Sequence, residues 1–203
     1  MRPLLFIDHY DSFSSNLVDW LETKSTFKVK RVFSDDINGL FHARSLNIPV
    51  VLSPGPKAPT DAVNTINFVK DVLGKRPVLG VCLGHQILGH VLGWKVIRCE
   101  EPSHGDQLKI LRLDGSVLLE GVSDVFEAAT YNSLVLSPDN IPLGCKVTAV
   151  SRYDEVQAFE KIMAGGASIF GVQFHPESFL SEGVSSILEG FCRAVDSWQS
   201  SSG

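Results

Sequence analysis

The chain has 203 residues and a formal net charge of −5, from 18 basic and 23 acidic side chains. Hydrophobic residues make up 44% of it, enough to bury one sizeable core. An acidic chain without a lysine and arginine cluster lacks the basic face that nucleic-acid phosphates require. The N-terminal apolar run is broken at Asp8, unlike a signal peptide, and no run is as long as a membrane span. We expect a cytoplasmic protein that binds neither nucleic acid nor membrane.

The first half of the chain alternates strand and helix patterns. Short apolar runs predict strands over 3–8, 48–56 and 76–82, the second of them closed by a proline–glycine turn, and alternation with period two predicts a strand over 27–33. Helical spacing predicts helices over 16–22, from Thr60 or Asp61 to Gly74, and over the residues that directly follow the strand at 76–82. This order implies a parallel sheet that is covered on both faces.

The pattern changes beyond Lys95. Short alternating segments at 108–113, 146–153 and 168–174 are typical of antiparallel strands added to one edge of the sheet. A last helix is predicted over 184–198. The fold class is therefore α/β, doubly wound and mostly parallel with a small antiparallel extension, and residues 1–198 are expected to form one domain, with 199–203 a tail or the start of a linker.

Four cysteines (82, 99, 145 and 192) lie far apart, and none has CxxC or metal-ligand spacing. No metal or cofactor is expected. Cys82 stands out because VLGVCLGHQ places it between two glycines at the end of an apolar strand. G-x-C-x-G is the thiol counterpart of the nucleophile elbow, in which any Cβ at the flanking positions would collide with backbone. A thiol there also lies at the positive end of a helix, which favours thiolate. The alternative is an inert, packed thiol.

A nucleophilic cysteine needs a base and a group that orients the base. GVQFHPES provides both, because Pro176 keeps His175 extended and residues two apart in an extended segment face the same side. His175 and Glu177 can therefore act together, although a structural histidine at a strand end is the alternative. The main rival is His104, which lies in a loop beside Asp106. The others are weaker candidates: His9, His42, His85 and His90.

The oxyanion formed by attack needs backbone N–H donors. Leu83, directly after the nucleophile, offers one. SPGP offers a second at Gly55, where the missing side chain lets backbone approach a ligand. Taken alone, SPGP would indicate an ordinary turn.

Five segments together carry a resemblance: FIDHYDSFSSNLV, LSPGP, GVCLGHQ, YNSL and GVQFHPES. In order and spacing they are similar to class I glutamine amidotransferases, in particular the amidotransferase components or domains of anthranilate synthase and aminodeoxychorismate synthase. The resemblance covers nearly the whole chain and implies a flavodoxin-like sheet, which agrees with the pattern above.

The resemblance also implies the site. It makes Cys82 the nucleophile, His175 the base and Glu177 its orienting group. Gly55 and Leu83 would form the oxyanion hole and contact glutamine. The remaining contacts to glutamine would come from Gln86, Ser133 and Leu134.

The implied reaction is hydrolysis of L-glutamine to L-glutamate and ammonia through a γ-glutamyl thioester on Cys82. Ammonia would pass to a chorismate-binding synthase, either a separate subunit or a domain of a fused chain. The stretch DHYDSF, 8–13, is a candidate contact surface for that partner. Alternatively, Asp11 or Ser12 caps a helix beginning near Phe13, and one residue can serve both purposes.

Four positions depart from the family pattern. Lys57 stands where relatives have glycine, Thr130 and Asn132 replace an arginine and a histidine, and Asp106 replaces a lysine. They leave open whether the product is anthranilate or aminodeoxychorismate, with aminodeoxychorismate favoured. Two other functions stay open: a hydrolase of γ-glutamyl compounds or other small amides, and an inactive regulatory or scaffold subunit.

Overall fold

A computed structural model of the chain describes residues 1–103 and 105–201. Within them the strands form one eleven-stranded sheet, nine of them in the order β2-β1-β3-β4-β11-β10-β9-β6-β7, with β5 and β8 at its side. Five strands are parallel to one another: β2 (Phe27–Phe33), β1 (Arg2–Asp8), β3 (Val50–Leu52), β4 (Val78–Val81) and β11 (Ile169–Val172). This is the flavodoxin-like order, with β11 as the fifth strand. The predicted α/β fold class is confirmed.

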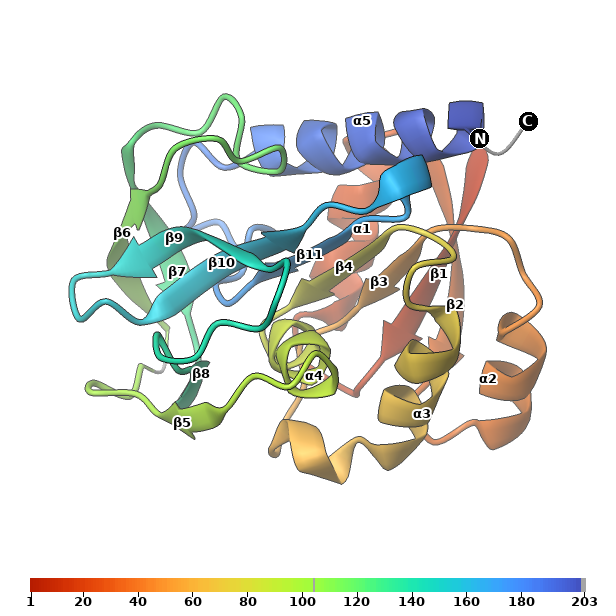
Figure 1. Cartoon of the computed structure of the whole chain (residues 1–203), viewed down its shortest axis with the longest axis horizontal. Coiled ribbons are helices and arrows are strands. Elements are labelled where there is room, and N and C mark those ends of the chain that lie inside the picture. Colours follow the sequence, from red (N-terminus) through yellow and green to blue (C-terminus); the bar gives the residue numbers. More distant parts are fainter. Residues whose placement is uncertain (104, 202–203) are drawn as a thin grey trace.

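Helices cover both faces of the parallel strands (Figure 1). On one face lie α1 (Ser14–Thr23) and α5 (Ser186–Ser201), and on the other α2 (Ile37–Ala43), α3 (Val63–Val72) and α4 (Leu83–Val91). Each face has its own apolar core, one built with α1 and α5 and the other with α2, α3 and α4. The central strands are buried on both sides, which explains their continuous apolar sequences. Two short 3-10 turns, η1 (Pro59–Asp61) and η2 (Ala164–Gly166), complete the helical segments.

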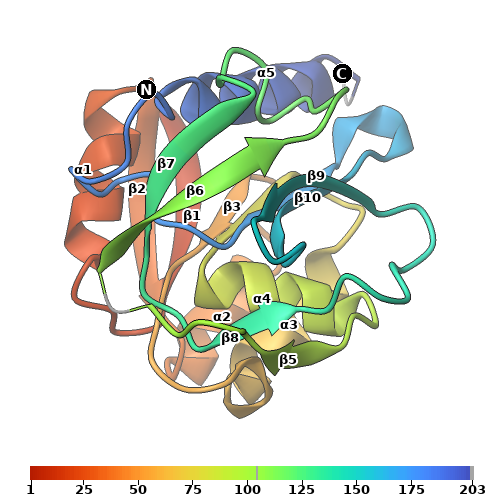
Figure 2. The ribbon, with the colours of Figure 1, turned by 90° about the vertical axis from the view of Figure 1, so that its left-hand side faces the viewer.

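The remaining strands form the antiparallel extension at one side of the sheet (Figure 2). They are β5 (Val96–Arg98), β6 (Asp106–Arg112), β7 (Val125–Thr130), β8 (Leu134–Leu136), β9 (Lys146–Ser151) and β10 (Val156–Lys161). The predicted strands at 108–113 and 146–153 belong here. The third predicted strand, at 168–174, does not: β11 pairs in parallel with β4 and is antiparallel only to β10.

The helix boundaries also differ from expectation. A helix that the apolar pattern did not indicate, α2, follows Asp36, whose carboxylate accepts from the N–H of Gly39 at 2.8 Å and caps its first turn. The last helix continues to Ser201, three residues beyond its predicted end.

Candidate active site

Cys82 stands at the turn between β4 and α4. Its φ of 52° and ψ of −104° lie in a region that residues with a side chain rarely adopt. Its backbone N–H donates to the carbonyl oxygen of Val172 at 2.9 Å, which holds the turn against β11. The local backbone therefore has the strained geometry that the elbow pattern predicts.

The two flanking glycines make this turn possible. A Cβ on Gly80 would lie 2.4 Å from the backbone of Gly84, and a Cβ on Gly84 would lie 2.4 Å from the carbonyl oxygen of Leu52. Both contacts are with backbone, which cannot rotate away. The expected collision at the flanking positions is confirmed, and glycine is required at both for steric reasons.

His175 and Glu177 form an ion pair in the interior, three and five residues after the end of β11. His175 Nδ1 lies 2.8 Å from Glu177 Oε1, and both side chains are almost fully buried. The backbone of His175 is fixed twice, since its N–H donates to the carbonyl oxygen of Ala129 and its own carbonyl oxygen accepts from the hydroxyl of Ser181. The two side chains meet as predicted, but not along an extended segment. Pro176 and Glu177 lie in a turn, in which the N–H of Ser178 donates to the carbonyl oxygen of His175 at 3.2 Å.

The surroundings of His175 favour its charged form. Burial by itself would lower the pKa of the imidazole, but the contacts with Cys82 and Glu177 outweigh it and raise the pKa to about 10. His175 is therefore an imidazolium at neutral pH. The second ring nitrogen, Nε2, makes no hydrogen bond to any described residue. Cys82 lies close enough to the ring to contribute to this rise in pKa.

A cavity of about 140 Å³ opens beside Cys82. All five residues expected to contact glutamine line it: Gly55, Leu83, Gln86, Ser133 and Leu134. The backbone of Gly55 packs against His9, so that a Cβ added to Gly55 would lie 2.5 Å from the Cβ of His9. The structure thus brings the predicted nucleophile and the predicted substrate contacts to one opening, although their roles stay predictions.

Two of the four positions that depart from the family pattern line this cavity, and the other two line a neighbouring hollow. Lys57 lines it and has a φ of 77°, so a lysine holds the backbone conformation that glycine adopts more easily. Asn132 lines it as well and borders a second hollow of about 320 Å³, which is also lined by Thr130 and Asp106. The departures therefore change the walls around the cavity, and the pair of His175 and Glu177 is untouched.

The competing histidines lie elsewhere. His9 is buried at the end of β1, where its ring nitrogens contact the hydroxyls of Ser53 at 3.1 Å and Thr65 at 3.0 Å. Burial lowers its pKa to about 4, and burial likewise lowers that of His85 to about 3. His42 and His90 lie on α2 and α4, and neither lines the cavity. His104, the main rival, lies outside the described residues.

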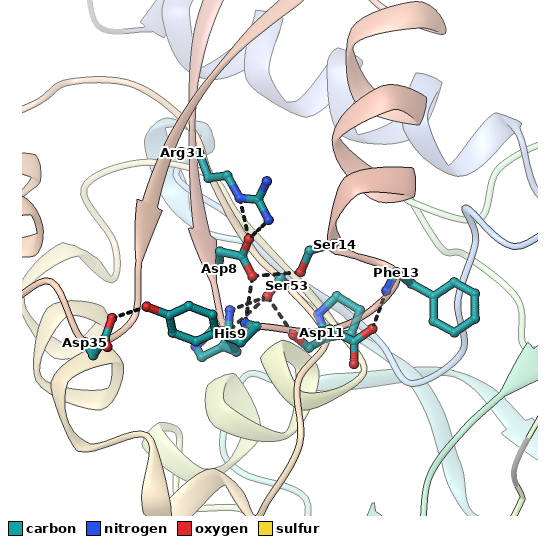
Figure 3. Close-up of polar contacts among 10 residues, drawn as sticks. Asp8, His9, Asp11, Phe13, Ser14, Arg31, Asp35 and Ser53 are labelled. Carbon is teal, nitrogen blue, oxygen red and sulfur yellow. Dashed lines mark hydrogen bonds and ion pairs between the residues drawn. The ribbon is translucent and has the colours of Figure 1, made fainter.

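The stretch 8–13 forms part of the same edge of the sheet (Figure 3). Asp8 is buried, pairs with Arg31 and accepts from the hydroxyl of Ser14 at 2.8 Å. Asp11 accepts from the N–H of Phe13 at 2.8 Å, which supports the turn before α1, while α1 itself starts at Ser14 without a side-chain cap. The capping prediction is therefore only partly right, since Asp11 acts ahead of the helix.

Two contributors to the site were not predicted. Tyr131 lines the cavity, and its ring meets that of His175 edge-on at 4.9 Å between centroids. Gln173 is buried and donates from its amide nitrogen to the sulfur of Cys82 at 3.7 Å. The signal for Gln173 was its position directly after β11 and two residues before His175.

The other three cysteines lie in different surroundings. Cys99, Cys145 and Cys192 are free thiols whose pKa burial raises, which is typical of packed cysteines. Within residues 1–103 and 105–201 no cluster of three or more metal-binding side chains occurs. In that same part of the chain, no helix has the length and apolar character to cross a membrane.

Comparison with known proteins decides the family. The family model for class I glutamine amidotransferases matches residues 5–195, nearly the whole chain. The chain belongs to this family. A crystal structure of a Thermoplasma acidophilum protein assigned to GMP synthase has the same fold, with a TM-score of 0.84 over 98% of this chain and 96% of that one, at 20% identity.

Curated relatives of this amidotransferase are more similar in sequence. Aminodeoxychorismate synthase component 2 of Serratia marcescens is 39% identical over 192 residues, which cover 93% of this chain and 98% of that protein. Aminodeoxychorismate/anthranilate synthase component 2 of Bacillus subtilis is 36% identical, in an alignment that covers 93% of this chain and 94% of that protein. The bifunctional protein TrpGD of Thermotoga maritima is 33% identical over 97% of this chain, which spans only 33% of that longer protein.

Proposed function

We propose that this amidotransferase hydrolyses L-glutamine and supplies the ammonia to a chorismate-using synthase. The observation that carries the proposal is the buried pair of His175 and Glu177 beside Cys82, on an elbow that opens into a cavity lined by Gly55 and Leu83. This arrangement provides the nucleophile, the proton carrier and the backbone donors that amide cleavage needs.

The first half of the reaction forms the thioester. The thiolate of Cys82 attacks the side-chain amide carbon of glutamine, and the resulting oxyanion faces the backbone N–H groups of Leu83 and Gly55. The N–H of Leu83 is the first of α4, so no partner within the helix competes for it. The imidazolium of His175 then donates its Nε2 proton to the leaving nitrogen, and ammonia departs from a γ-glutamyl thioester.

The second half releases glutamate. Neutral His175 takes a proton from water, the hydroxide attacks the thioester carbon, and the sulfur of Cys82 leaves as thiolate. Glu177 stabilises the imidazolium that forms again at this point. Each cycle thus returns the thiolate and imidazolium pair with which it began.

Ammonia is protonated in bulk water at neutral pH, so a partner must receive it directly. The names of the relatives in Serratia marcescens and Bacillus subtilis describe them as component 2 of a synthase, which implies a second component. We infer that this chain likewise assembles with a chorismate-binding subunit or domain. Residues 1–198 would be the amidotransferase domain of that assembly. Residues 8–13 are a candidate docking face for this partner. Tyr10 is 58% exposed, stacks on Phe33, and lines a hollow that shares Lys57 and Leu83 with the cavity.

The test is glutamine hydrolysis by the purified chain, with and without component 1 of an aminodeoxychorismate synthase or of an anthranilate synthase, in the presence of chorismate. We expect the partner to raise hydrolysis and one aminated product to form, with aminodeoxychorismate favoured. The variant Cys82→Ser should abolish ammonia release, and the matched variant Cys99→Ser should not. Full release by Cys82→Ser would refute the proposal, and hydrolysis of small amides other than glutamine would favour a general amidase.

A further inference from the structure

Gln173 connects the reactive sulfur to the substrate cavity. It lies between β11 and His175, is fully buried, and uses both ends of its side-chain amide. Its Nε2 donates to Cys82 Sγ at 3.7 Å, and its Oε1 accepts from Gln86 Nε2 at 3.0 Å. None of the reaction steps above uses Gln173, so the contact with sulfur needs its own explanation.

The direction of this chain of hydrogen bonds is fixed by a backbone carbonyl. The carbonyl oxygen of Leu134 can only accept hydrogen bonds. It accepts one from Gln86 Nε2 at 2.8 Å and one from Asn132 Nδ2 at 3.1 Å. Gln86 must therefore present its amino group to both Leu134 and Gln173. Gln173 must in turn present its oxygen to Gln86 and its nitrogen to the sulfur, because the reverse orientation would set two donors against each other.

The same reasoning assigns the free group of Gln86. Its two N–H hydrogens go to Leu134 and Gln173. The Oε1 of Gln86 is then the one polar atom of this side chain that the network does not use. Because Gln86 lines the cavity, this oxygen would be able to accept from an N–H of the substrate.

An N–H directed at Cys82 Sγ has a consequence for catalysis. A hydrogen bond to an ionised acceptor is roughly twice as strong as one between neutral groups, so the amide of Gln173 favours thiolate over thiol. The bond also holds the sulfur in one rotamer beside the cavity. It assists attack by keeping the sulfur ionised and in place. Because it weakens on acylation and re-forms as the thiolate leaves, it also assists deacylation.

We propose that Gln173 is a positioning residue that holds the Cys82 thiolate and joins it, through Gln86, to the cavity segment at Leu134. The inference rests on the proposed function for its catalytic meaning. A purely structural role is the competing explanation, because any buried amide must find hydrogen-bond partners. The two differ in whether the chemistry at sulfur changes when the amide is removed.

The test is the variant Gln173→Met, which conserves volume and removes the donor to sulfur. Alkylation of Cys82 by iodoacetamide, followed by peptide mass spectrometry to separate it from the other three cysteines, should slow roughly tenfold at neutral pH. In glutamine hydrolysis we expect kcat to fall roughly ten- to hundredfold while KM changes little. Alkylation requires no turnover and no partner, so it is informative even if the proposed function fails.

The matched control is Gln157→Met, a glutamine on β10 that is also buried, 1% exposed, and whose side-chain oxygen has no hydrogen-bond partner among the described residues. This variant should keep the wild-type alkylation rate and kcat. If Gln173→Met matches it in both measurements, the proposal is overturned.

A second variant covers the case in which Gln173→Met does not fold. Gln173→Glu keeps an acceptor for Gln86 but places a carboxylate beside the sulfur at neutral pH. We expect its alkylation rate, relative to wild type, to fall further as pH rises and to recover towards acid, where a protonated carboxyl can donate to sulfur. A ratio that does not change with pH would contradict a role at the sulfur.

Discussion

Two buried histidines at the same edge of the sheet have opposite charge states. His9, at the end of β1, contacts the hydroxyls of Ser53 and Thr65, and burial lowers its pKa to about 4 even though Asp8 partly offsets the effect. His175, beyond the end of β11, is equally buried, but Cys82 and Glu177 raise its pKa to about 10. Burial alone thus gives a neutral imidazole, and a charged one requires an ionised partner built into the same enclosure.

The comparison shows how a structural histidine can be told from a catalytic candidate in this fold. The hydroxyls of Ser53 and Thr65 satisfy the ring nitrogens of His9 without stabilising its protonated form. The carboxylate of Glu177 favours one, and the second ring nitrogen of His175 stays unpaired among the described residues and is available. A histidine that holds a charge and keeps one nitrogen free can donate a proton, whereas a fully paired neutral one cannot.

The largest expected difference is in activity. His175→Gln should reduce kcat/KM for glutamine hydrolysis roughly 10³-fold or more, because the leaving nitrogen loses its proton donor. His9→Gln should change kcat/KM by only a few fold. Steady-state assays of both variants compare the two sites directly, and a severe loss in His9→Gln would break the distinction.

Glu177→Gln should have the next largest effect. Without the carboxylate the pKa of His175 falls, so the imidazolium is lost at lower pH. We expect kcat to fall roughly 10²-fold and the alkaline limb of the pH–rate profile to move from near pH 10 towards neutrality. An unchanged alkaline limb would show that Glu177 does not maintain the charge.

Acid should destabilise the fold through the neutral histidines. The folded pKa values of about 4 for His9 and about 3 for His85 lie below the unfolded value of 6.5. The unfolded chain therefore binds protons more readily, and their stabilising contribution is lost as pH falls below 6.5. Between pH 7 and pH 5 the free energy of unfolding should drop by about 2 kcal/mol for each histidine.

His175 should behave in the opposite way. Its folded pKa is raised, so its contribution is complete below pH 6.5 and is lost as pH rises to about 10. Urea unfolding at a series of pH values gives both slopes. Stability that did not fall between pH 7 and pH 5 would contradict the neutral state of His9 and His85.

The smallest expected effect is that of Thr65→Val. It leaves Nε2 of buried His9 without a partner and should cost about 1–3 kcal/mol of stability, measured as a lower urea midpoint. Because Thr65 lies away from the cavity, kcat should stay at the wild-type value. A fall in kcat under conditions in which the variant is fully folded would show that the end of β1 contributes to catalysis.

The sequence was most informative where function depends on a local pattern. Gly80, Cys82 and Gly84 predict the elbow because its geometry is set within five residues. The HPE spacing correctly predicts that His175 and Glu177 meet, although a turn and not an extended segment brings them together. The parallel pairing of β11 was missed, although its uninterrupted apolar sequence was the signal. The short helix α2 was missed because seven residues carry too little periodicity.

Contacts that depend on tertiary packing could not be obtained in this way. Gln173 reaches Cys82 only because β11 lies beside β4, and the register that joins them pairs residues more than ninety positions apart. Likewise Tyr131 meets His175 only once β7 has joined the sheet. Such residues look like ordinary polar or aromatic side chains in the sequence.

The left-handed backbone at Cys82 has a cost that activity alone explains. Holding a side chain at φ 52° costs roughly 1–3 kcal/mol, and glycine at that position would be spared most of it. The chain would therefore fold more securely with glycine at this position, which has no Cβ to strain. Selection of this protein for greater thermal stability will therefore tend to replace Cys82 and so remove the reactive thiol.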